Sequence, residues 1–484
     1  MAKPIQRIFK LDNLYREDFV YFPLIFILAA TIRLVTLPVS GLWYDELQSV
    51  THSILPVKDL LLSVGKFDPH PPFYYLQLHY WMLFGTSDEW IKLNSVGWSL
   101  LTLIVLFFLC RDLFNPKIAY LAALLFALSP FAISYAQEAR MYASLMFFGV
   151  SSFYFFHRFV KVENGWYLLG GIVMSLAFLY SHGAGFLILV STGAYAILVL
   201  VESGFHKVKV FLLLCLALLT TLVYYLPWLY KASTISVGHT ITPNLSDVIN
   251  TLYILLGGYA EVPAYLKWSM VLLCALGLAI WSLRNSGLRM LALAYVLVPV
   301  IFCIFVSLFI RPIWLYRTIA YTLPFWCIAI AFILYHTGPS NKRKAGNTLW
   351  RYGLIVIALS LFGYATYTQQ TWFARNPGVE DAARFLQSVA RPGDVIYAPS
   401  ERVFWGLGWY LVGPGSVNPI TTSHILGTRS GLTLVSNDAL TALLDETKDW
   451  IVYRSIAEAG ASTVVQPNTA VWDFHDVQVV RWER

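Results

Sequence analysis

Charged residues are scarce in this sequence. Only 13% of its 484 residues are Asp, Glu, Lys or Arg, whereas 58% are apolar. A soluble globular domain carries about 25% charged residues, so this chain cannot hide its apolar surface in a core surrounded by water. Lipid must be part of its solvent, and an ordinary soluble enzyme or binding module is excluded.

Cysteine is also sparse, and the sequence lacks internal repeats, low-complexity segments and a single basic patch. Its five cysteines fall in or at the edge of apolar runs without metal-ligand spacing, so neither disulfides nor a cysteine metal site is expected: Cys110, Cys215, Cys274, Cys303 and Cys327. The formal charge of +7 comes from Lys and Arg residues that separate apolar runs. This arrangement indicates membrane topology and argues against nucleic-acid binding.

Long apolar runs are abundant. A helix needs about 20 apolar residues to cross a bilayer. We predict about eleven spans, near 19–38, 92–110, 117–135, 141–157, 166–181, 184–201, 208–230, 266–283, 288–310, 313–335 and 351–369. The first is expected to be a retained helix and not a cleaved signal peptide. The stretch from Phe73 to Gly85 is too short to cross and is expected to lie in the membrane interface.

The distribution of Lys and Arg predicts the orientation. A cytoplasmic N-terminus places these cations inside: Lys3, Arg7, Lys10, Arg16, Arg111, Lys117, Arg158, Lys161, Lys207, Lys209, Arg284, Arg289, Lys342, Arg343, Lys344 and Arg351. The outer segments are longer in total but hold fewer, so the positive-inside rule is met. If residues 73–85 crossed, every later loop would reverse and the Asn341–Lys344 cluster would face outward.

The predicted fold is a polytopic α-helical membrane protein with a small C-terminal soluble α/β domain. The predicted parts are a transmembrane catalytic domain of residues 1–369, with a large first outer loop at 39–91, and a domain of residues 370–484. In that domain we expect a helix from Gly378 to Val389 and strands from Asp394 to Ala398 and Val477 to Trp482. An odd number of spans places this domain on the outer face.

Ionisable and aromatic side chains gather in the predicted outer segments. The clusters are Trp43-Tyr44-Asp45-Glu46, Asp68-Pro69-His70-Pro71-Pro72, the turn from Ser134 to Tyr142 with Glu138 and Arg140, Tyr180-Ser181-His182-Gly183, and Arg311 to Arg317. Ionisable groups near membrane depth are expensive and are functional candidates. Their convergence on one side predicts an active site at the outer face.

Each cluster also has a purely structural interpretation. Asp45 and Glu46 could cap an interfacial helix, and Glu138 with Arg140 could form an ion pair between helix ends. His70 could be a turn residue, and His182 could hydrogen-bond a backbone carbonyl. Arg317 could extend to lipid headgroups.

Taken in order, these residues resemble the bacterial GT-C membrane glycosyltransferases related to protein O-mannosyltransferases and to the lipid A aminoarabinose transferase, a glycosyltransferase family 39-like group. The matching motifs are Asp45-Glu46, His70-Pro71-Pro72 followed by Phe73-Tyr74-Tyr75, Gln137 to Tyr142, Tyr180-Ser181-His182, and Arg317 with Pro324. The resemblance extends over about the first 330 residues and implies a GT-C fold. Lys92-Leu93-Asn94-Ser95 departs from it, because relatives often have Arg-Leu-Pro-Ser there.

The resemblance implies an inverting transfer from a polyprenyl-phosphate sugar donor to a lipid, glycan or protein acceptor. The residue types suit this chemistry, because a phosphate leaving group needs cations and the acceptor needs one base. We expect Asp45 to be the base, and Arg317 and Arg140 to bind the donor phosphate. The residues expected to assist catalysis, bind sugar or acceptor, or hold a divalent metal are Glu46, His70, Glu138, His182, Tyr44 and Tyr142.

The expected location is the bacterial inner membrane, with the acceptor in the periplasm and no nucleic acid as partner. No cofactor is certain from the sequence, and a divalent metal is one option. A transporter or flippase of lipid-linked sugars is the alternative. It would tend to show repeats and broken helices near the midplane, and the sequence indicates neither. A non-catalytic sugar-binding protein would have no need of a base such as Asp45.

Overall fold

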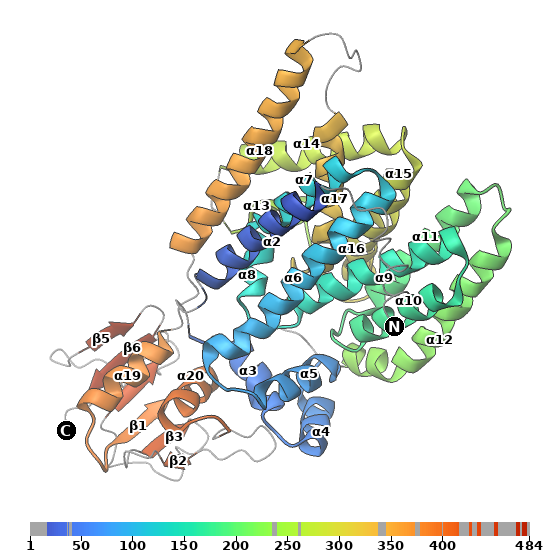
Figure 1. Ribbon diagram of the computed structural model, residues 1–484. Helices are drawn as coiled ribbons and strands as arrows, with labels where there is room; N and C mark the ends of the chain where they lie inside the picture. Colours follow the sequence, from blue (N-terminus) through green and yellow to red (C-terminus); the bar gives the residue numbers. More distant parts are fainter. Residues whose placement is uncertain are drawn as a thin grey trace. The chain divides into compact units, whose positions relative to one another are not determined.

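The computed structural model describes residues 17–35, 37, 41–234, 240–259, 263–336, 345–372, 378–398, 400–415, 425–427, 433–436, 450–453, 471–474 and 477–481. The chain forms two compact units (Figure 1). The first unit comprises Met1–Thr36, Pro69–Phe73 and Ser95–Phe373, and the second comprises Leu37–Asp68, Tyr74–Asn94 and Ala374–Arg484. Residues 39–91, the predicted first outer loop, therefore belong mainly to the same unit as the C-terminal region.

The first unit is helical. Its elements are α2 (Asp18–Val35), most of α6 (Asp88–Leu113), α7 (Pro116–Ala127), α8 (Pro130–Ala136), α9 (Tyr142–Val162), α10 (Gly165–Leu179), α11 (Phe186–Glu202), α12 (Val208–Thr234), α13 (Leu245–Gly257), α14 (Ala264–Ser282), α15 (Ser286–Ala292), the π-helical η3 (Leu293–Leu297), α16 (Val298–Phe309), the 3₁₀-helical η4 (Ala320–Thr322), α17 (Leu323–His336) and α18 (Ala345–Trp372). Every predicted span coincides at least in part with one of these helices.

Five helical stretches among the described residues are long and apolar enough to cross a membrane. They are α2, α6, α12 as far as Lys231, α14, and the continuous stretch Ser286–Phe309. The pair α7 and α8 makes a sixth if it is one bent span. On α12 the exposed side chains include Leu212, Leu216, Leu219 and Val223, which recur at helical spacing and form an apolar stripe suited to lipid. The number of eleven spans stays a prediction.

Two predicted spans differ from the structure in their course. The stretch 117–135 is broken into α7 and α8, which meet at an angle of 59°. The break falls at Ser129-Pro130, where a proline begins the second helix and a serine caps it. The sequence indicated no broken helix near the membrane midplane, and this bend, either a broken span or a re-entrant loop, was not predicted. The predicted span 313–335 is helical only from Ala320, because the preceding segment forms a loop.

Ion pairs show which helix ends share a face of the first unit. Asp18, at the start of α2, pairs with Arg111 near the end of α6 at 2.9 Å. These ends lie on one side of a membrane only if the chain crosses an even number of times between them. Helices α2 and α6 account for two crossings. A crossing by α5 (Phe73–Met82) would make the number odd, so α5 does not cross the membrane. This agrees with the interpretation of residues 73–85 as too short to span.

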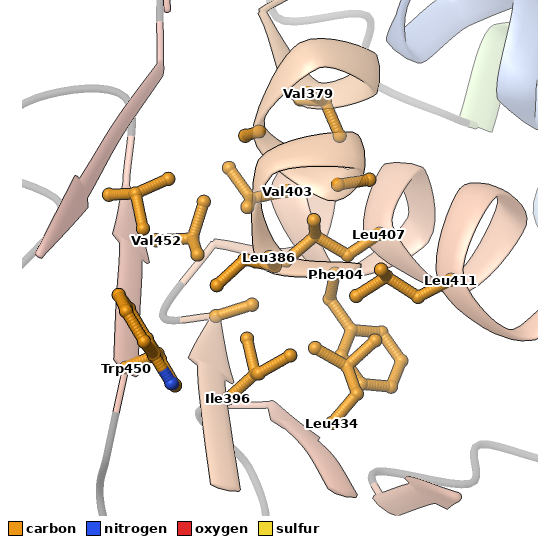
Figure 2. Packing of buried hydrophobic residues seen from close by; sticks show 14 of the residues in the cluster. Val379, Leu386, Ile396, Val403, Phe404, Leu407, Leu411, Leu434, Trp450 and Val452 are labelled. Carbon is orange, nitrogen blue, oxygen red and sulfur yellow. The ribbon is translucent and has the colours of Figure 1, made fainter. Parts of the chain in front are cut away.

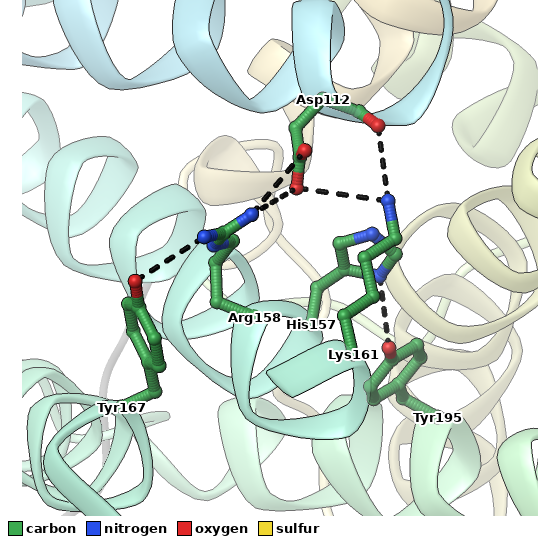
Figure 3. A network of polar contacts seen from close by, with 6 residues as sticks. All are labelled: Asp112, His157, Arg158, Lys161, Tyr167 and Tyr195. Atoms are coloured by element: carbon green, nitrogen blue, oxygen red, sulfur yellow. Dashed lines mark hydrogen bonds and ion pairs between the residues drawn. The ribbon is translucent and has the colours of Figure 1, made fainter. Parts of the chain in front are cut away.

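A buried polar network joins α6 to α9 on the same face (Figure 3). The Arg158 guanidinium lies 3.4 Å from the Asp112 carboxylate and donates to the Tyr167 hydroxyl at 3.2 Å. Lys161 Nζ donates to the Asp112 carbonyl at 3.0 Å. Both Asp112 and Arg158 side chains are almost fully buried, so the Arg158 charge depends on Asp112 for stabilisation, while Asp112 also has Lys161 Nζ at 3.6 Å from its carboxylate. Lys207 and Arg289, which the positive-inside rule also places in the cytoplasm, pair with acidic residues as well.

The replacement Asp112→Asn is expected to lower the free energy of unfolding by about 1–2 kcal/mol, because the amide keeps one acceptor but leaves Arg158 without a buried counter-charge. Thermal unfolding in detergent measures the loss. Glu163→Gln is the control, since the Glu163–Lys207 pair is exposed and such pairs contribute less than about 1 kcal/mol. Equal stability of the two variants would contradict a stabilising role for the network.

The second unit combines short helices with a mixed sheet. Its helices are α3 (Tyr44–Ser53), α4 (Val57–Phe67), α5, the first turns of α6, α19 (Val379–Val389), α20 (Glu401–Leu407) and the π-helical η5 (Gly408–Val412). Its strands are β1 (Val395–Ala398), β2 (Ile425–Gly427), β3 (Thr433–Ser436), β4 (Trp450–Tyr453), β5 (Val471–Phe474) and β6 (Val477–Arg481), in the order β2-β3-β1-β4-β6-β5. The central strand β1 is parallel to β3 and β4, and the outer pairs are antiparallel.

One apolar core holds α19 and α20 against this sheet (Figure 2). The amphipathic helix α19 buries Val379, Ala382, Ala383 and Leu386 on one face, as its apolar spacing predicts. These side chains meet Ile396, Val452 and other residues of the strands. The helix and strands predicted at 378–389, 394–398 and 477–482 thus have counterparts in α19, β1 and β6. The Asn341–Lys344 cluster lies outside the described residues.

Candidate active site

Two predicted motifs of the first unit meet through their histidines. The ring centroids of His70 and His182 lie 4.5 Å apart. Backbone hydrogen bonds hold the two segments together, because Phe73 N donates to Tyr180 O at 2.9 Å and Gly183 N donates to His70 Nδ1 at 3.1 Å. Segments more than a hundred residues apart in the sequence therefore form one structural element of the site.

The hydrogen bonds of these histidines indicate their protonation. His70 Nδ1 accepts from Gly183 N, and His182 Nδ1 accepts from Ala184 N at 3.0 Å. A ring nitrogen that accepts a hydrogen bond carries no proton, so the network assigns the proton of each neutral ring to Nε2. Each neutral imidazole then carries its N–H at Nε2. The Nδ1 contact of His182 is to a backbone amide of its own turn.

The row of side chains continues to an arginine. The Tyr142 ring lies 5.9 Å from that of His182, and the Arg317 guanidinium lies 5.9 Å from the Tyr142 ring. Arg317 also lies 5.6 Å from the ring of Tyr316. His70, His182, Tyr142 and Arg317 come from four separate segments that the sequence predicts to be outer loops or turns. The structure brings these four predicted site residues together, and we call them the site row.

Further tyrosines surround the Arg317 end of the site row. The Tyr135 ring lies 4.8 Å from Tyr142, and its hydroxyl is 2.9 Å from the hydroxyl of Tyr259. The Tyr259 ring in turn lies 5.7 Å from Tyr316. Aromatic faces attract a cation, so they favour the guanidinium in this place, and Arg317 Nε also donates to Tyr316 Oη at 3.4 Å. Tyr135 and Tyr259 were not among the predicted site residues.

Arg317 is positioned by a tryptophan three residues before it. The buried Trp314 side chain donates from Nε1 to Thr251 Oγ1 at 3.0 Å, and Ile241 N donates to Trp314 O at 3.3 Å. Thr251 belongs to α13, which was not predicted as a span. This helix therefore fixes the loop before η4.

Glu138 and Arg140 occupy the turn between α8 and α9. Both side chains are buried, with 3% and 4% of their surface exposed. Arg140 N donates to Glu138 O at 2.8 Å, which closes the turn just before Tyr142. The Glu138 carboxylate also interacts electrostatically with Arg317. This turn therefore contributes a carboxylate to the surroundings of the site row.

Sequence reasoning missed Arg33, a fully buried residue of α2. Its guanidinium donates to Phe126 O at 3.2 Å and to Ala127 O at 3.0 Å, the last carbonyls of α7. Its own carbonyl accepts from Gln137 Nε2 at 2.9 Å. Arg33 thus stabilises the break between α7 and α8 and the turn that follows. The available signal was an arginine within an apolar run.

Tyr44, Asp45 and Glu46 belong to the second unit, at the start of α3. Glu46 Oε2 accepts a hydrogen bond from Trp43 N at 3.0 Å, so Glu46 caps the helix, as one structural interpretation allowed. Asp45 is half-buried, and its carbonyl accepts from Ser49 Oγ at 3.1 Å. The Arg402 guanidinium lies 5.0 Å from the ring of Tyr44.

Among the described residues no group of three or more His, Cys, Asp or Glu side chains is arranged to hold a metal ion. The two histidines of the site row already use Nδ1 for backbone contacts. The described part of the chain thus has no preformed group of this kind, and a divalent metal stays a prediction.

The chain was compared with known proteins. Residues 69–230 match the family model described as dolichyl-phosphate-mannose-protein mannosyltransferase. This range contains His70, Glu138, Arg140, Tyr142 and His182. No match was found among curated protein sequences.

Two solved proteins share the fold. ArnT from Cupriavidus metallidurans in the apo state is 14% identical with a TM-score of 0.63, covering 95% of this chain and 97% of that chain. The same protein bound to undecaprenyl phosphate is 14% identical with a TM-score of 0.60 at the same coverage. The apo oligosaccharyltransferase of Archaeoglobus fulgidus is 11% identical with a TM-score of 0.54, covering 91% and 70% of the two chains. Its complex with Zn and sulfate is 12% identical with a TM-score of 0.50, covering 88% and 67%.

At these identities the structural likeness establishes the fold. The family match is independent evidence for residues 69–230, which contain most of the motifs. The resemblance inferred from Asp45-Glu46, His70-Pro71-Pro72 and the later motifs is confirmed. The chain thus has the fold of ArnT and, over residues 69–230, matches the mannosyltransferase family model, in agreement with the resemblance to the GT-C membrane glycosyltransferases.

Proposed function

We propose that the protein is an inverting glycosyltransferase of the bacterial inner membrane. It transfers a sugar from a polyprenyl-phosphate donor to a lipid, glycan or protein acceptor on the outer face. The observation that carries this proposal is the site row of His70, His182, Tyr142 and Arg317. The structural similarity to ArnT, which was solved with undecaprenyl phosphate, supports the lipid-linked donor.

Arg317 is proposed to bind the departing phosphate, with Arg140 as a second phosphate ligand. A guanidinium presents several N–H donors in a plane and forms strong charge-assisted hydrogen bonds with phosphate oxygens. Charge grows on the phosphate as the bond to the sugar breaks, so a cation there stabilises the transition state more than the bound donor. The tyrosines around Arg317 limit water in its surroundings and strengthen this effect.

His70 and His182 are proposed to orient the sugar or the phosphate as neutral hydrogen-bond donors. Each ring accepts a backbone hydrogen bond at Nδ1, which assigns its proton to Nε2 and fixes the orientation of the ring. Tyr44 and Tyr142 provide aromatic faces suited to a sugar ring, and Glu138 provides a carboxylate for its hydroxyls. No step is assigned to a metal ion, and transfer in the presence of a chelator tests the remaining option of a divalent metal.

Asp45 is proposed as the base that accepts the proton of the acceptor nucleophile. The acceptor oxygen or nitrogen forms a new bond to the anomeric carbon as the bond to the phosphate oxygen breaks. The proton passes to the Asp45 carboxylate, and the electron pair leaves with the phosphate. Glu46 supports this base from the next position by capping α3.

Reconstitution in liposomes tests the proposed function. Purified protein should transfer radiolabelled sugar from a defined polyprenyl-phosphate donor to extracted envelope acceptors. Movement of the donor between leaflets is measured in the same vesicles. Transfer without net donor movement is the expected result. Donor movement without transfer would instead establish the transporter or flippase alternative. This alternative is tested because transporters often contain broken helices, and α7 and α8 form a bent pair.

We also predict that residues after Gln370 lie outside and that the loop containing Asn341–Lys344 lies in the cytoplasm. Single cysteines are introduced at Ser388, which is exposed on α19, and at Ser340. An impermeant thiol reagent should label Ser388→Cys and spare Ser340→Cys in intact spheroplasts. The unsubstituted protein gives the background from its five cysteines. The reverse pattern would place the proposed site in the cytoplasm.

A further inference from the structure

The three residues before α3 are each held by a hydrogen bond within the second unit. Lys92 Nζ donates to Gly41 O at 3.0 Å, Leu42 N donates to Tyr410 Oη at 2.7 Å, and Trp43 N donates to Glu46 Oε2 at 3.0 Å. Asp45 follows two residues later. The backbone that leads into this proposed base is therefore restrained at consecutive positions.

The contact with Leu42 comes from the C-terminal region. Tyr410 lies in η5, and its hydroxyl accepts from Leu42 N while donating to Asp88 Oδ2 at 2.7 Å. Trp409 Nε1 donates to the other oxygen of Asp88 at 3.3 Å. Burial and the nearby Asp88 carboxylate raise the pKa of Tyr410 well above its ordinary value. Its hydroxyl thus stays protonated and can serve both partners at once.

The packing around Gly41 shows how closely this segment meets the C-terminal region. A Cβ added to Gly41 would lie 2.5 Å from Glu380 Oε2 and 2.7 Å from Tyr410 Oη. The Glu380 side chain can move, but the Tyr410 hydroxyl ends a rigid ring that Asp88 holds. Gly41 does not have a positive φ, so alanine is excluded there by space and not by backbone conformation.

A second contact acts on the residue beside Asp45. The Tyr44 ring lies 5.8 Å from Trp405 and 5.0 Å from the Arg402 guanidinium, both on α20. Helix α3 has only ten residues, and an isolated helix of this length is marginally stable. Its direction must therefore come from tertiary contacts, and α20 and η5 supply several of them.

We propose that Tyr410, held by Asp88, is a positioning residue for Asp45, so that the C-terminal region sets the geometry of the first outer loop. This inference rests on the proposed function, because it assumes that Asp45 acts in sugar transfer. The physical reason is that the efficiency of a general base depends on its placement within a fraction of an ångström. It also gives Lys92, which departs from the family pattern, a defined role at Gly41.

The test uses the full-length protein with Tyr410→Phe, which keeps the ring and removes both hydrogen bonds. We expect kcat for transfer to fall about five- to tenfold while KM for the polyprenyl-phosphate donor changes less than about twofold. Hydrogen exchange measured by mass spectrometry should accelerate in peptides covering Leu42 to Leu47. Exchange in peptides covering β1 should stay unchanged, which shows that the sheet remains folded.

A pair of glycine variants provides the matched control. Gly41→Ala should reduce kcat at least as much as Tyr410→Phe, because the methyl group displaces the tyrosine hydroxyl. Gly65→Ala in α4 of the same unit should leave transfer unchanged, since a Cβ there meets no atom within 4 Å. Alanine at position 65 also has a higher helix propensity than glycine, so the substitution should not destabilise α4.

The outcomes separate this inference from the proposed function. If Tyr410→Phe leaves either kcat or the exchange of Leu42 to Leu47 unchanged while the parent protein is active, Tyr410 does not position Asp45. If the parent protein transfers no sugar, the proposed function fails. The exchange comparison then still decides whether Tyr410 restrains the segment before α3.

Discussion

The replacement Asp45→Asn is expected to reduce sugar transfer by about 10²–10⁴-fold, the usual contribution of a general base. Asparagine has the shape of aspartate but accepts no proton at neutral pH. The substitution therefore removes the basicity of the side chain at position 45 while it keeps the packing. Asp45 is half-buried at the start of α3, and the hydrogen bond from Ser49 goes to its main-chain carbonyl, which the substitution leaves in place. The variant should remain folded, inserted and able to bind the donor.

The measurement is single-turnover transfer from a defined polyprenyl-phosphate donor, together with donor binding by the same preparation. Asp59→Asn is the matched control, because Asp59 is an acidic residue in the first turn of the neighbouring helix α4. It should transfer at the parental rate. A near-parental rate for Asp45→Asn would move the base elsewhere, with Glu46 or Glu138 as the next candidates.

Glu46 should respond differently from Asp45. Its carboxylate caps the backbone of Trp43, and glutamine can still accept that hydrogen bond. Glu46→Gln should therefore spare more activity than Asp45→Asn. The contrast between these neighbours distinguishes a base from a residue that shapes the helix start.

The replacement Arg317→Ala is expected to weaken donor binding and transfer by about tenfold to a hundredfold. Losing a charged hydrogen bond to phosphate costs about 1.5–3 kcal/mol. The ring contacts with Tyr142 and Tyr316 would be lost as well, so the tyrosines could shift. Arg317→Lys should restore only part of the affinity, because an ammonium provides charge without the planar set of donors.

Titration with a fluorescent or radiolabelled polyprenyl phosphate measures the change directly. Arg284→Ala is a suitable control, since its guanidinium also lies over an aromatic ring, 5.4 Å from Trp281, but in a segment predicted to be cytoplasmic. It should bind the donor as the parent does. Unchanged donor affinity and full transfer in Arg317→Ala would remove Arg317 from the phosphate site.

Several features could be predicted because they depend on local sequence and on the solvent. The long apolar runs near 19–38, 92–110 and 208–230 became helices, since a lipid environment demands that backbone groups be satisfied within each segment. The spacing of apolar residues also predicted the amphipathic helix α19, and the short apolar run at 73–85 predicted that α5 is too short to span. The motifs around His70, Tyr142, His182 and Arg317 predicted the GT-C fold, which the structure confirms, because their order and chemistry are specific in combination.

Other features arise from contacts between distant segments and leave no local pattern. Helix α13 is held against the Arg317 loop by the bond between Trp314 and Thr251, and neither residue stands out in the sequence. The role of Arg33 depends on carbonyls nearly a hundred residues away. The tautomer of His70, with its proton on Nε2, follows from the hydrogen bond that Gly183 N donates to Nδ1.

The sequence by itself predicted a membrane protein with several apolar helices, a GT-C fold and the motifs that resemble membrane glycosyltransferases, because hydrophobic run length and motif chemistry are properties of the chain alone. Only the tertiary structure decided that four motif residues form one row and that Tyr410 reaches Leu42 ahead of Asp45. Such contacts join residues far apart in the chain. Their geometry is set by the packing of whole elements, which no short stretch of sequence records.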